Sequence, residues 1–384
     1  MMRRFVILAL AVGLASLVPA RATAVPIFAE RYGFKCTQCH TAVPDLNAFG
    51  EHFRRAGYRL PNVPTQHEFP LVLRLQDTWT KDLLPSQNRR FNALAILIST
   101  ANFGPGDQYS YFTRYLFGSQ GAAGSLYYGF VQHVAPGSGS FQRFGLFGLQ
   151  TIANATQRLD TITSQPAYTY TVGHSLANFS TPRLGAEFGI RNDSKDIELA
   201  MSFDEYHGAA YGAPAPPSDL AQSFARPELF GTATFALSPE LQVGALGLNG
   251  KRGFASRSTG ASYSDVYYRD GLQAMWTSPS RRFDLTGQQL WGHDDNSDGF
   301  GTPLTSSGGF LTFKYHPTHN SYVGVRYDAA ANPFATRDYD FYAVWAPTIH
   351  ARLVVEHVKP IGFGATSPST GAQLLFVIPF EHKT

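Results

Sequence analysis

A hydrophobic alternation with a period of two residues recurs from about Leu71 to near the end of the chain. In the segment 197–204, apolar side chains alternate with polar or small ones: Ile197, Leu199, Met201 and Phe203 against Glu198, Ala200, Ser202 and Asp204. The segments 184–191 and, less strictly, 338–345 show the same pattern. Successive side chains of a strand point to opposite faces, so each segment predicts a strand with one apolar face. A soluble β-sandwich would show this alternation too.

The connections between the predicted strands alternate strictly between short and long. The short ones are tight turns at 347–348, 317–319, 278–280, 238–239 and 192–194. The long ones are 359–370, 330–337, 292–307, 250–262 and 207–226. Short periplasmic turns and long external loops are typical of outer-membrane barrels. The crossings of a Greek-key sandwich give no reason for such an alternation.

We therefore predict a mainly β protein, an antiparallel outer-membrane β-barrel of about 16 strands, an even number as in bacterial barrels. The strands lie near 70–80, 93–103, 109–118, 125–133, 141–153, 183–191, 195–206, 227–237, 240–249, 263–277, 282–291, 308–316, 321–329, 338–346, 350–358 and 371–380. The stretch 167–174 resembles a strand, but counting it would reverse the parity of every later turn. We assign it to a long external loop, 154–182, that can fold into the mouth. A soluble β fold is the alternative.

A barrel of this size encloses an aqueous lumen rather than a packed core. Polar side chains opposite the lipid face should line the lumen, where solvation alone accounts for them: Arg74, Arg114, Glu187, Arg191, Glu198, Asp204, Arg326, Asp328 and Asp340. Aromatic residues are placed to form interfacial girdles, although in a soluble barrel they would be packing: Tyr109, Tyr127, Tyr267, Trp276, Trp291, Tyr339 and Trp345. The segment 294–299 matches the first half of an EF-hand loop, but Thr305 replaces the bidentate Glu. We interpret it as an acidic external loop, with which weak cation capture is compatible.

Composition excludes several other classes of protein. Charged residues make up 15% of the chain, against about 25% in soluble proteins. The net charge of +3 is spread along the chain, so a nucleic-acid partner has no electrostatic support. The 30 Phe and 19 Tyr argue against disorder. After the N-terminus no apolar run reaches the roughly 18 residues that a spanning helix needs.

The N-terminus is typical of a secretory signal peptide. Met1-Met2-Arg3-Arg4 is basic, residues 5–18 are apolar, and Ala22-Thr23-Ala24 supplies a small-x-small cleavage pattern, which predicts a signal peptide over 1–24. The alternative is an uncleaved anchor helix. An exported protein usually contains disulfides, yet this chain has two Cys, three positions apart.

Those cysteines form the sequence Cys36-Thr37-Gln38-Cys39-His40, the C-x-x-C-H signature of covalent c-type haem attachment. Each thiol can form a thioether with one porphyrin vinyl group, and His40 is then placed as the axial iron ligand. A redox dithiol or half of a zinc site are the alternatives. No second Cys pair completes a zinc site, and a thioredoxin-like motif would need a βαβ context.

The sixth iron ligand is narrowed by composition. After the signal peptide, methionine occurs only at Met201 and Met275, in predicted strands, so the haem segment cannot supply a methionine ligand. His52, in a helix-like stretch at 44–58, and His67 are the local candidates, and either can equally be a solvated side chain. A His from elsewhere or an open site are the other options. Methionine ligation raises haem potential, so bis-His ligation favours a lower one.

Residues 26–58 resemble the outer-membrane monohaem cytochrome–porin fusions, whose best-known members oxidise ferrous iron at the cell surface. The resemblance rests on Pro26, Phe28-Ala29, Gly33, Cys36, Cys39-His40-Thr41, Pro44, Leu46, Phe49-Gly50, Phe53 and Gly57-Tyr58. Val43 departs from the aromatic residue expected there, and residues 381–384 trail the last predicted strand. The resemblance implies a small helical c-type haem domain over 25–69 with one covalent haem c, ahead of a transmembrane barrel over 70–384.

The sequence and the resemblance together predict an electron conduit in the outer membrane of a Gram-negative bacterium, embedded in outer-membrane lipid. It would take electrons from an extracellular donor such as Fe(II) through the haem, at the periplasmic end or in the lumen, to a periplasmic c-type cytochrome or similar carrier. With iron as donor, the chain would be an Fe(II):cytochrome c oxidoreductase. The alternatives are a diffusion porin with a haem-bearing plug that senses or gates, and a reductase that runs electrons outward.

Overall fold

The structure is a computed structural model, and it describes residues 32–42, 45–55, 71–81, 90–117, 124–135, 137–151, 160–192, 194–205, 219–332, 334–348, 350–362 and 368–380. The predicted signal peptide at 1–24 and the candidate ligand His67 lie outside these residues. Within the described part of the chain, no helix has the length and apolarity needed to cross a membrane.

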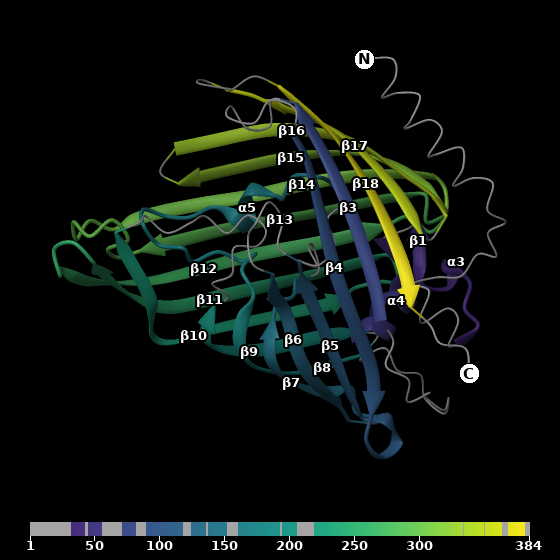
Figure 1. Cartoon of the computed structure of the whole chain (residues 1–384), viewed down its shortest axis with the longest axis horizontal. Coiled ribbons are helices and arrows are strands. Elements are labelled where there is room, and N and C mark those ends of the chain that lie inside the picture. Colours follow the sequence, from purple (N-terminus) through teal and green to yellow (C-terminus); the bar gives the residue numbers. More distant parts are fainter. Residues whose placement is uncertain are drawn as a thin grey trace.

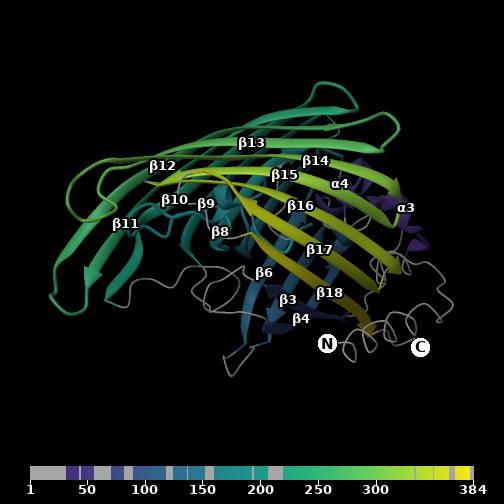
Figure 2. The same ribbon diagram turned by 90° about the horizontal axis from the view of Figure 1, so that it is seen from above.

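Sixteen described strands form one closed antiparallel barrel in which every strand pairs with its neighbours along the chain (Figure 1, Figure 2). They are β3 (Leu71–Lys81), β4 (Arg90–Phe103), β5 (Tyr109–Leu116), β6 (Ser125–Val134), β7 (Ser140–Phe147), β8 (Arg183–Arg191), β9 (Lys195–Glu205), β10 (Leu220–Ala236), β11 (Leu241–Ser256), β12 (Ser262–Thr277), β13 (Phe283–Asp294), β14 (Leu304–Thr318), β15 (Ser321–Asn332), β16 (Phe334–Thr348), β17 (Ala351–Pro360) and β18 (Ser369–Phe380). The barrel closes where β18 pairs with β3, with Phe380 opposite Leu71. Closure leaves no open sheet edge, as a barrel in lipid requires.

The predicted number of strands is confirmed, and so is the exclusion of 167–174 from the barrel. That stretch contains a short helix, α5 (Pro166–Thr169), and no barrel strand. The prediction of a long loop at 330–337 is wrong. The ladder pairs Ala330 with Thr336 and Asn332 with Phe334, so β15 and β16 continue through this segment as a tight hairpin.

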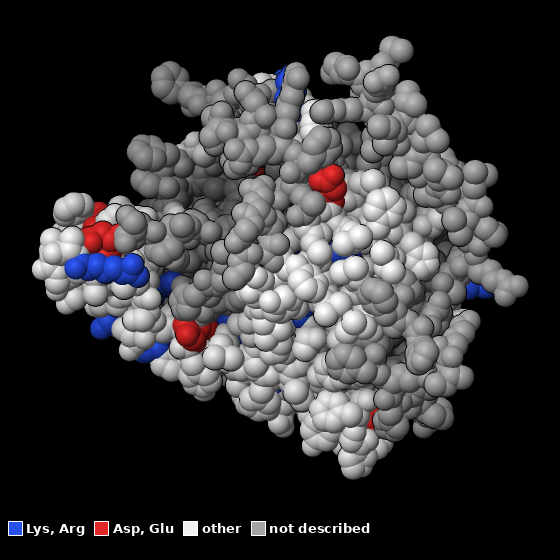
Figure 3. All heavy atoms as spheres, in the orientation of Figure 1, with Lys and Arg blue, Asp and Glu red and all other residues white. Residues whose placement is uncertain are grey.

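The two faces of the barrel wall are reversed relative to a soluble protein. On β9, Leu199 is 57% exposed whereas its neighbour Glu198 is 4% exposed. Figure 3 shows that, on one face of the molecule, described charged side chains are sparse over the strands. An apolar exterior around a polar interior is the pattern of a membrane barrel. The outer face of the wall is therefore suited to lipid, which the soluble alternative does not explain.

Most of the predicted lumen and girdle residues lie on the expected faces. The predicted lumen residues that are buried are Arg114, Glu187, Arg191, Glu198, Arg326, Asp328 and Asp340. Arg74 is half-buried, and the assignment of Asp204 to the lumen is wrong because it is exposed near the end of β9, where the pairing with β8 shifts register. The girdle residues that are exposed are Tyr109, Trp276, Trp291, Tyr339 and Trp345.

Tyr127 and Tyr267 are not girdle residues, because both are buried. Tyr267 lies on the inward face, where its hydroxyl donates to Glu228 at 2.6 Å. Tyr127 lies at a bulge between β5 and β6, where Arg114 pairs with Tyr128 and Tyr115 with Leu126. The bulge adds one residue to β6 and so changes which side chains face inward.

Ahead of the barrel lie four short elements: α3 (Cys36–Cys39), β1 (His40–Ala42), β2 (Asp45–Leu46) and α4 (Ala48–Arg55). The helix expected over 44–58 is shorter in the described residues, because Asn47 caps it: Asn47 Oδ1 accepts a hydrogen bond from the Gly50 N–H at 2.9 Å. Leu46 instead pairs with His40 in the β1–β2 ladder. These elements contain less helix than the predicted helical domain, and the haem domain stays a prediction.

The lipid-facing assignment predicts a position-dependent cost of adding charge. Leu199→Arg, in the middle of β9, should lower the free energy of unfolding from lipid vesicles by about 2–4 kcal/mol. Leu237→Arg is the matched control, because Leu237 is 65% exposed at the short turn after β10, where the cost should be about 0–1 kcal/mol. Urea titration followed by tryptophan fluorescence measures both. Equal costs at the two positions would contradict the assignment.

Candidate functional site

The segment that carries the C-x-x-C-H sequence packs inside the end of the barrel where the short turns lie. Phe53 of α4 is 4% exposed and packs against Val72 of β3, with Ile98 of β4 and Val377 of β18 in the same cluster. These wall residues lie near the start of β3 and the ends of β4 and β18. Figure 1 shows α3, α4 and β1 together beside that end of β18. We call residues 32–42 and 45–55 the motif segment.

Aromatic rings build the core of the motif segment. Phe34 packs edge-on against Phe49 and Phe53, with ring centroids 5.6 Å and 5.9 Å apart. Tyr32 stacks on Phe34 at 5.4 Å. Such ring pairs add to the apolar area that is removed from water. The segment is thereby anchored to the barrel wall by apolar packing.

Asn47 and Gly50 hold α4 against α3. The Asn47 side-chain amide donates to the backbone oxygens of Thr37 (3.2 Å) and Gln38 (3.0 Å). A Cβ atom at Gly50 would overlap the carbonyl oxygen of Cys39, so only glycine permits this approach. Cys39 is buried beneath α4.

The motif residues follow one another along the chain, with Cys39 buried and His40 half-buried. Cys36 and Cys39 begin and end the single turn of α3, and His40 is the first residue of β1. His319, in the short turn after β14, donates Nδ1–H to the carbonyl oxygen of Thr41 at 3.2 Å. Two thiol-bearing residues one helical turn apart, followed directly by an imidazole, are the donor set that a covalent haem requires, so the residues fit that group.

The local candidates for the sixth ligand remain predictions. His52 belongs to α4, but its side chain lies outside the described part of the structure, and His67 lies outside it altogether. No group of three or more His, Cys, Asp or Glu side chains that could hold a metal ion occurs among the described residues.

A second segment, between β7 and β8, folds into the lumen. We call residues 148–151 and 160–182 the inner segment. On one side, Tyr168 and Phe179 join an apolar cluster with inward residues of β9 to β14, including Phe230 and Phe310. On the other side, the Ile162 and Thr163 N–H groups donate to the Glu356 carboxylate of β17, and Arg326 of β15 donates to Thr161 at 2.8 Å.

The inner segment therefore bridges walls that lie far apart around the barrel. β10 and β17 are separated by six strands in the order of the sheet. The expectation that the long loop 154–182 folds into the mouth is confirmed for its described residues, and Figure 1 shows α5 within the barrel outline. The Arg54 guanidinium of α4 donates to Gln150 at 2.9 Å. The inner segment and the motif segment are thus in direct contact.

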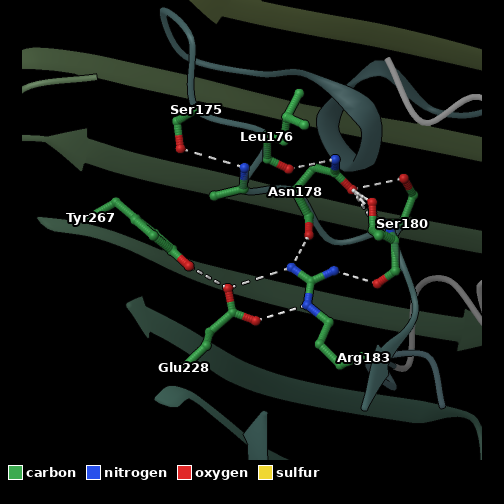
Figure 4. A network of polar contacts seen from close by, with 9 residues as sticks. Ser175, Leu176, Asn178, Ser180, Arg183, Glu228 and Tyr267 are labelled. Atoms are coloured by element: carbon green, nitrogen blue, oxygen red, sulfur yellow. Dashed lines mark hydrogen bonds and ion pairs between the residues drawn. The ribbon is translucent and has the colours of Figure 1, made fainter. Parts of the chain in front are cut away.

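A buried ion pair of the wall holds the inner segment through hydrogen bonds to its backbone, as Figure 4 shows. Arg183 Nε lies 2.8 Å from the Glu228 carboxylate, and Arg183 Nη2 donates to the carbonyl oxygen of Asn178 at 2.5 Å. Tyr267 donates to the same carboxylate. Sequence reasoning missed Arg183 and Glu228, because each lies near the end of its predicted strand (183–191 and 227–237) and their pairing crosses from β8 to β10.

The acidic loop at 294–299 also turns partly inward. Asp294 is buried and lies 2.9 Å from Arg269 Nη1, and Asp265 accepts a hydrogen bond from the Asn296 N–H at 2.8 Å. The carboxylate at the first position of the EF-hand-like sequence thus pairs with an arginine.

No protein-family model and no curated protein sequence matches this chain. Solved structures with a similar fold are outer-membrane channels. An anion-selective porin from Comamonas acidovorans aligns with a TM-score of 0.58 at 11% identity, over 83% of this chain and 100% of its own. The outer membrane channel DcaP of Acinetobacter baumannii aligns with a TM-score of 0.57 at 9% identity, over 84% and 100%. OmpF of Salmonella typhi, in complex with daunomycin, aligns with a TM-score of 0.56 at 8% identity, over 81% of this chain and 97% of its own.

At these identities the comparisons show a shared fold, the closed antiparallel barrel of 16 strands. They extend over more than four-fifths of this chain. No evidence of a cytochrome fusion comes from these neighbours, which are channels and porins.

The buried ion pair predicts a large cost of truncating one partner. Glu228→Ala would leave Arg183 buried without its carboxylate and should lower the free energy of unfolding by about 3–5 kcal/mol. Glu240→Ala, in the turn between β10 and β11, should cost about 0–1 kcal/mol. Denaturant titration of each variant in detergent measures both costs. A Glu228→Ala variant as stable as Glu240→Ala would show that the network does not stabilise the fold.

The inner segment predicts a low ion conductance. Replacing residues 161–175 with a short Gly-Ser linker should raise single-channel conductance in a planar bilayer several-fold, because it removes the bridge across the lumen. A Gly-Ser replacement at 257–261, in the exposed β11–β12 hairpin, is the control and should leave conductance unchanged. A parent protein that already conducts as well as the deletion variant would contradict an obstructing role.

Proposed function

We propose that this chain is an outer-membrane electron conduit that carries one covalent c-type haem at the short-turn end of a porin-like barrel. The observation that supports it best is that the segment with the C-x-x-C-H sequence packs inside that end of the barrel. Phe53 packs against Val72, and His319 donates a hydrogen bond to the Thr41 carbonyl oxygen. Short turns face the periplasm in bacterial barrels. A redox group at this end would then be accessible to periplasmic carriers.

The residues of α3 and β1 would hold the group. Cys36 and Cys39 would each add a thiol across one vinyl group of the porphyrin, and His40 would ligate the iron. When bound, haem supplies a one-electron centre that can accept an electron from a donor such as Fe(II), which becomes Fe(III), and release it to a periplasmic c-type cytochrome. With iron as donor, this makes the chain an Fe(II):cytochrome c oxidoreductase.

The chain's own residues provide the surroundings of that centre. Tyr32, Phe34, Phe49 and Phe53 keep the motif segment apolar on its barrel side, and low local polarity is one of the means by which a protein sets haem potential. The inner segment narrows the path for water and ions between the two mouths. The barrel itself holds these parts across an insulating membrane.

A diffusion porin with a haem-bearing plug that senses or gates is the second candidate. The fold comparisons favour it, because the solved neighbours are channels and porins. The buried polar lumen residues, such as Arg114 and Glu198, suit an aqueous path as well. An outward-running reductase would use the same residues as the conduit and differ in direction alone.

One set of measurements separates these functions. The purified mature protein should carry the added mass of one haem. On mixing with Fe(II), its absorbance spectrum should change rapidly from that of ferric haem to that of ferrous haem. The double variant Cys36→Ala, Cys39→Ala should lack haem and Fe(II) oxidation while the barrel still assembles, as judged by heat-modifiable gel mobility.

Two outcomes would count against the conduit. A mature chain without the haem mass would exclude all three haem-dependent functions. A haem-loaded protein that Fe(II) does not reduce, and that conducts ions freely in a bilayer, would favour the gated porin.

A further inference from the structure

The wall of the barrel presents a histidine next to the motif segment. His350 lies in the short turn before β17 and is held to the end of β18: its carbonyl oxygen accepts from the Val377 N–H at 2.8 Å, and its Nδ1–H donates to the Val377 carbonyl oxygen at 3.0 Å. Val377 belongs to the cluster around Phe53 of α4. His350 therefore contacts Val377, and Val377 in turn contacts the motif segment.

The alternation along β17 places His350 on the inward side. Arg352, Val354 and Glu356 are all buried, whereas Val355 and His357 are exposed. His350 directly precedes β17 and is hydrogen-bonded to Val377, an inward residue of β18, and side chains directly opposite each other in an antiparallel pair share one face. It thus lies on the lumen face at the end of the barrel that receives α4.

The hydrogen bond of His350 leaves the right nitrogen available. Because Nδ1 carries the proton given to Val377, Nε2 has its lone pair, and no hydrogen bond to Nε2 occurs among the described residues. Donation of the second ring N–H to a backbone carbonyl is the usual support of a metal-bound imidazole. Nε2 is also the nitrogen that can approach a porphyrin iron without the Cβ substituent colliding with the ring.

Among the described residues of the barrel wall, two other histidines at this end are less suited. His316 uses Nε2 in its contact with Asp284 at 2.7 Å, which leaves the hindered Nδ1. His319 is exposed and contacts Thr41, the residue directly after His40. His319 also has no hydrogen bond to its Nε2 among the described residues, but it is exposed, whereas His350 is half-buried and lies two residues from the buried Arg352. His350 meets the motif segment through Val377, which packs in the cluster around Phe53.

A buried cation stands beside His350 on the same face. Arg352 is 8% exposed, and its guanidinium makes one weak hydrogen bond, from Nη2 to Gln373 at 3.5 Å, while its Nε has no partner. Among the described residues no carboxylate pairs with it. A buried guanidinium without an anion is costly, so a missing anion is expected next to this side chain.

We propose that the barrel wall supplies the second half of the haem site, with His350 as the sixth iron ligand and Arg352 as the partner of a haem propionate. This inference rests on the proposed haem attachment at Cys36 and Cys39. The proposal accounts for two observations. His350 has an oriented imidazole with an available Nε2, and Arg352, two residues away on the same face, is buried without a carboxylate partner. The proposal also makes the barrel, and not the motif segment alone, the determinant of haem potential.

The spectrum of the loaded protein tests the iron ligand. The wild-type ferric haem should be six-coordinate and low-spin, with electron paramagnetic resonance signals of bis-histidine ligation. His350→Ala should keep the haem mass but become high-spin, and added imidazole should restore the low-spin signals. His316→Ala and His357→Ala are controls that should keep the wild-type spectrum.

Arg352 has its own readout. Arg352→Gln should lower the midpoint potential of the haem, because loss of a nearby positive charge favours the ferric state, whereas Arg352→Lys should stay near the wild-type value. Heat-modifiable gel mobility confirms that each barrel is assembled.

The outcomes separate this inference from the proposed function. A high-spin wild-type haem, a low-spin His350→Ala variant, or loss of the low-spin signals in His52→Ala instead would overturn the ligand assignment while the haem attachment stands. An Arg352→Gln potential equal to the wild type would overturn the propionate assignment. A wild-type chain without the haem mass would overturn the proposed function itself, and with it this inference.

Discussion

Every backbone polar group within a lipid bilayer must find its partner inside the protein, and this requirement determines the architecture of the chain. A sheet satisfies it only by closing, and here β18 pairs with β3 from Phe380–Leu71 onward. Closure fixes two faces on every strand. Leu199 and its apolar counterparts face outward, and residues such as Glu198 face a space that lipid cannot enter.

That space is then shaped by segments that belong to no strand. The inner segment is attached to one wall through Arg183 and Glu228 and to another through Glu356. Buried charges of this kind are stable only in pairs, so the ionic interior of the barrel also specifies where the inner segment can sit. The result is a lumen bridged from wall to wall, within a wall that has the fold of outer-membrane porins.

The motif segment adds chemistry to this frame. Its cysteines and His40 are adjacent in sequence, so their chemistry is local, but a haem has two faces and two propionates. The opposite face and the anionic edge would be met by residues that the fold brings near, and we propose His350 and Arg352 for these two roles. The proposed redox function and the barrel would then be parts of a single site.

The sequence by itself determined the strand count, the exclusion of 167–174 and the faces of most lumen residues, because alternation and turn length are local properties that each strand expresses separately. It also determined the candidate haem residues Cys36, Cys39 and His40, since their spacing alone carries the chemistry. Only the tertiary structure decided that Tyr127 and Tyr267 face inward, through a bulge and a buried carboxylate. It alone paired Arg183 with Glu228 and joined His350 to Val377, because contacts across a closed barrel join residues whose separation along the chain carries no signal.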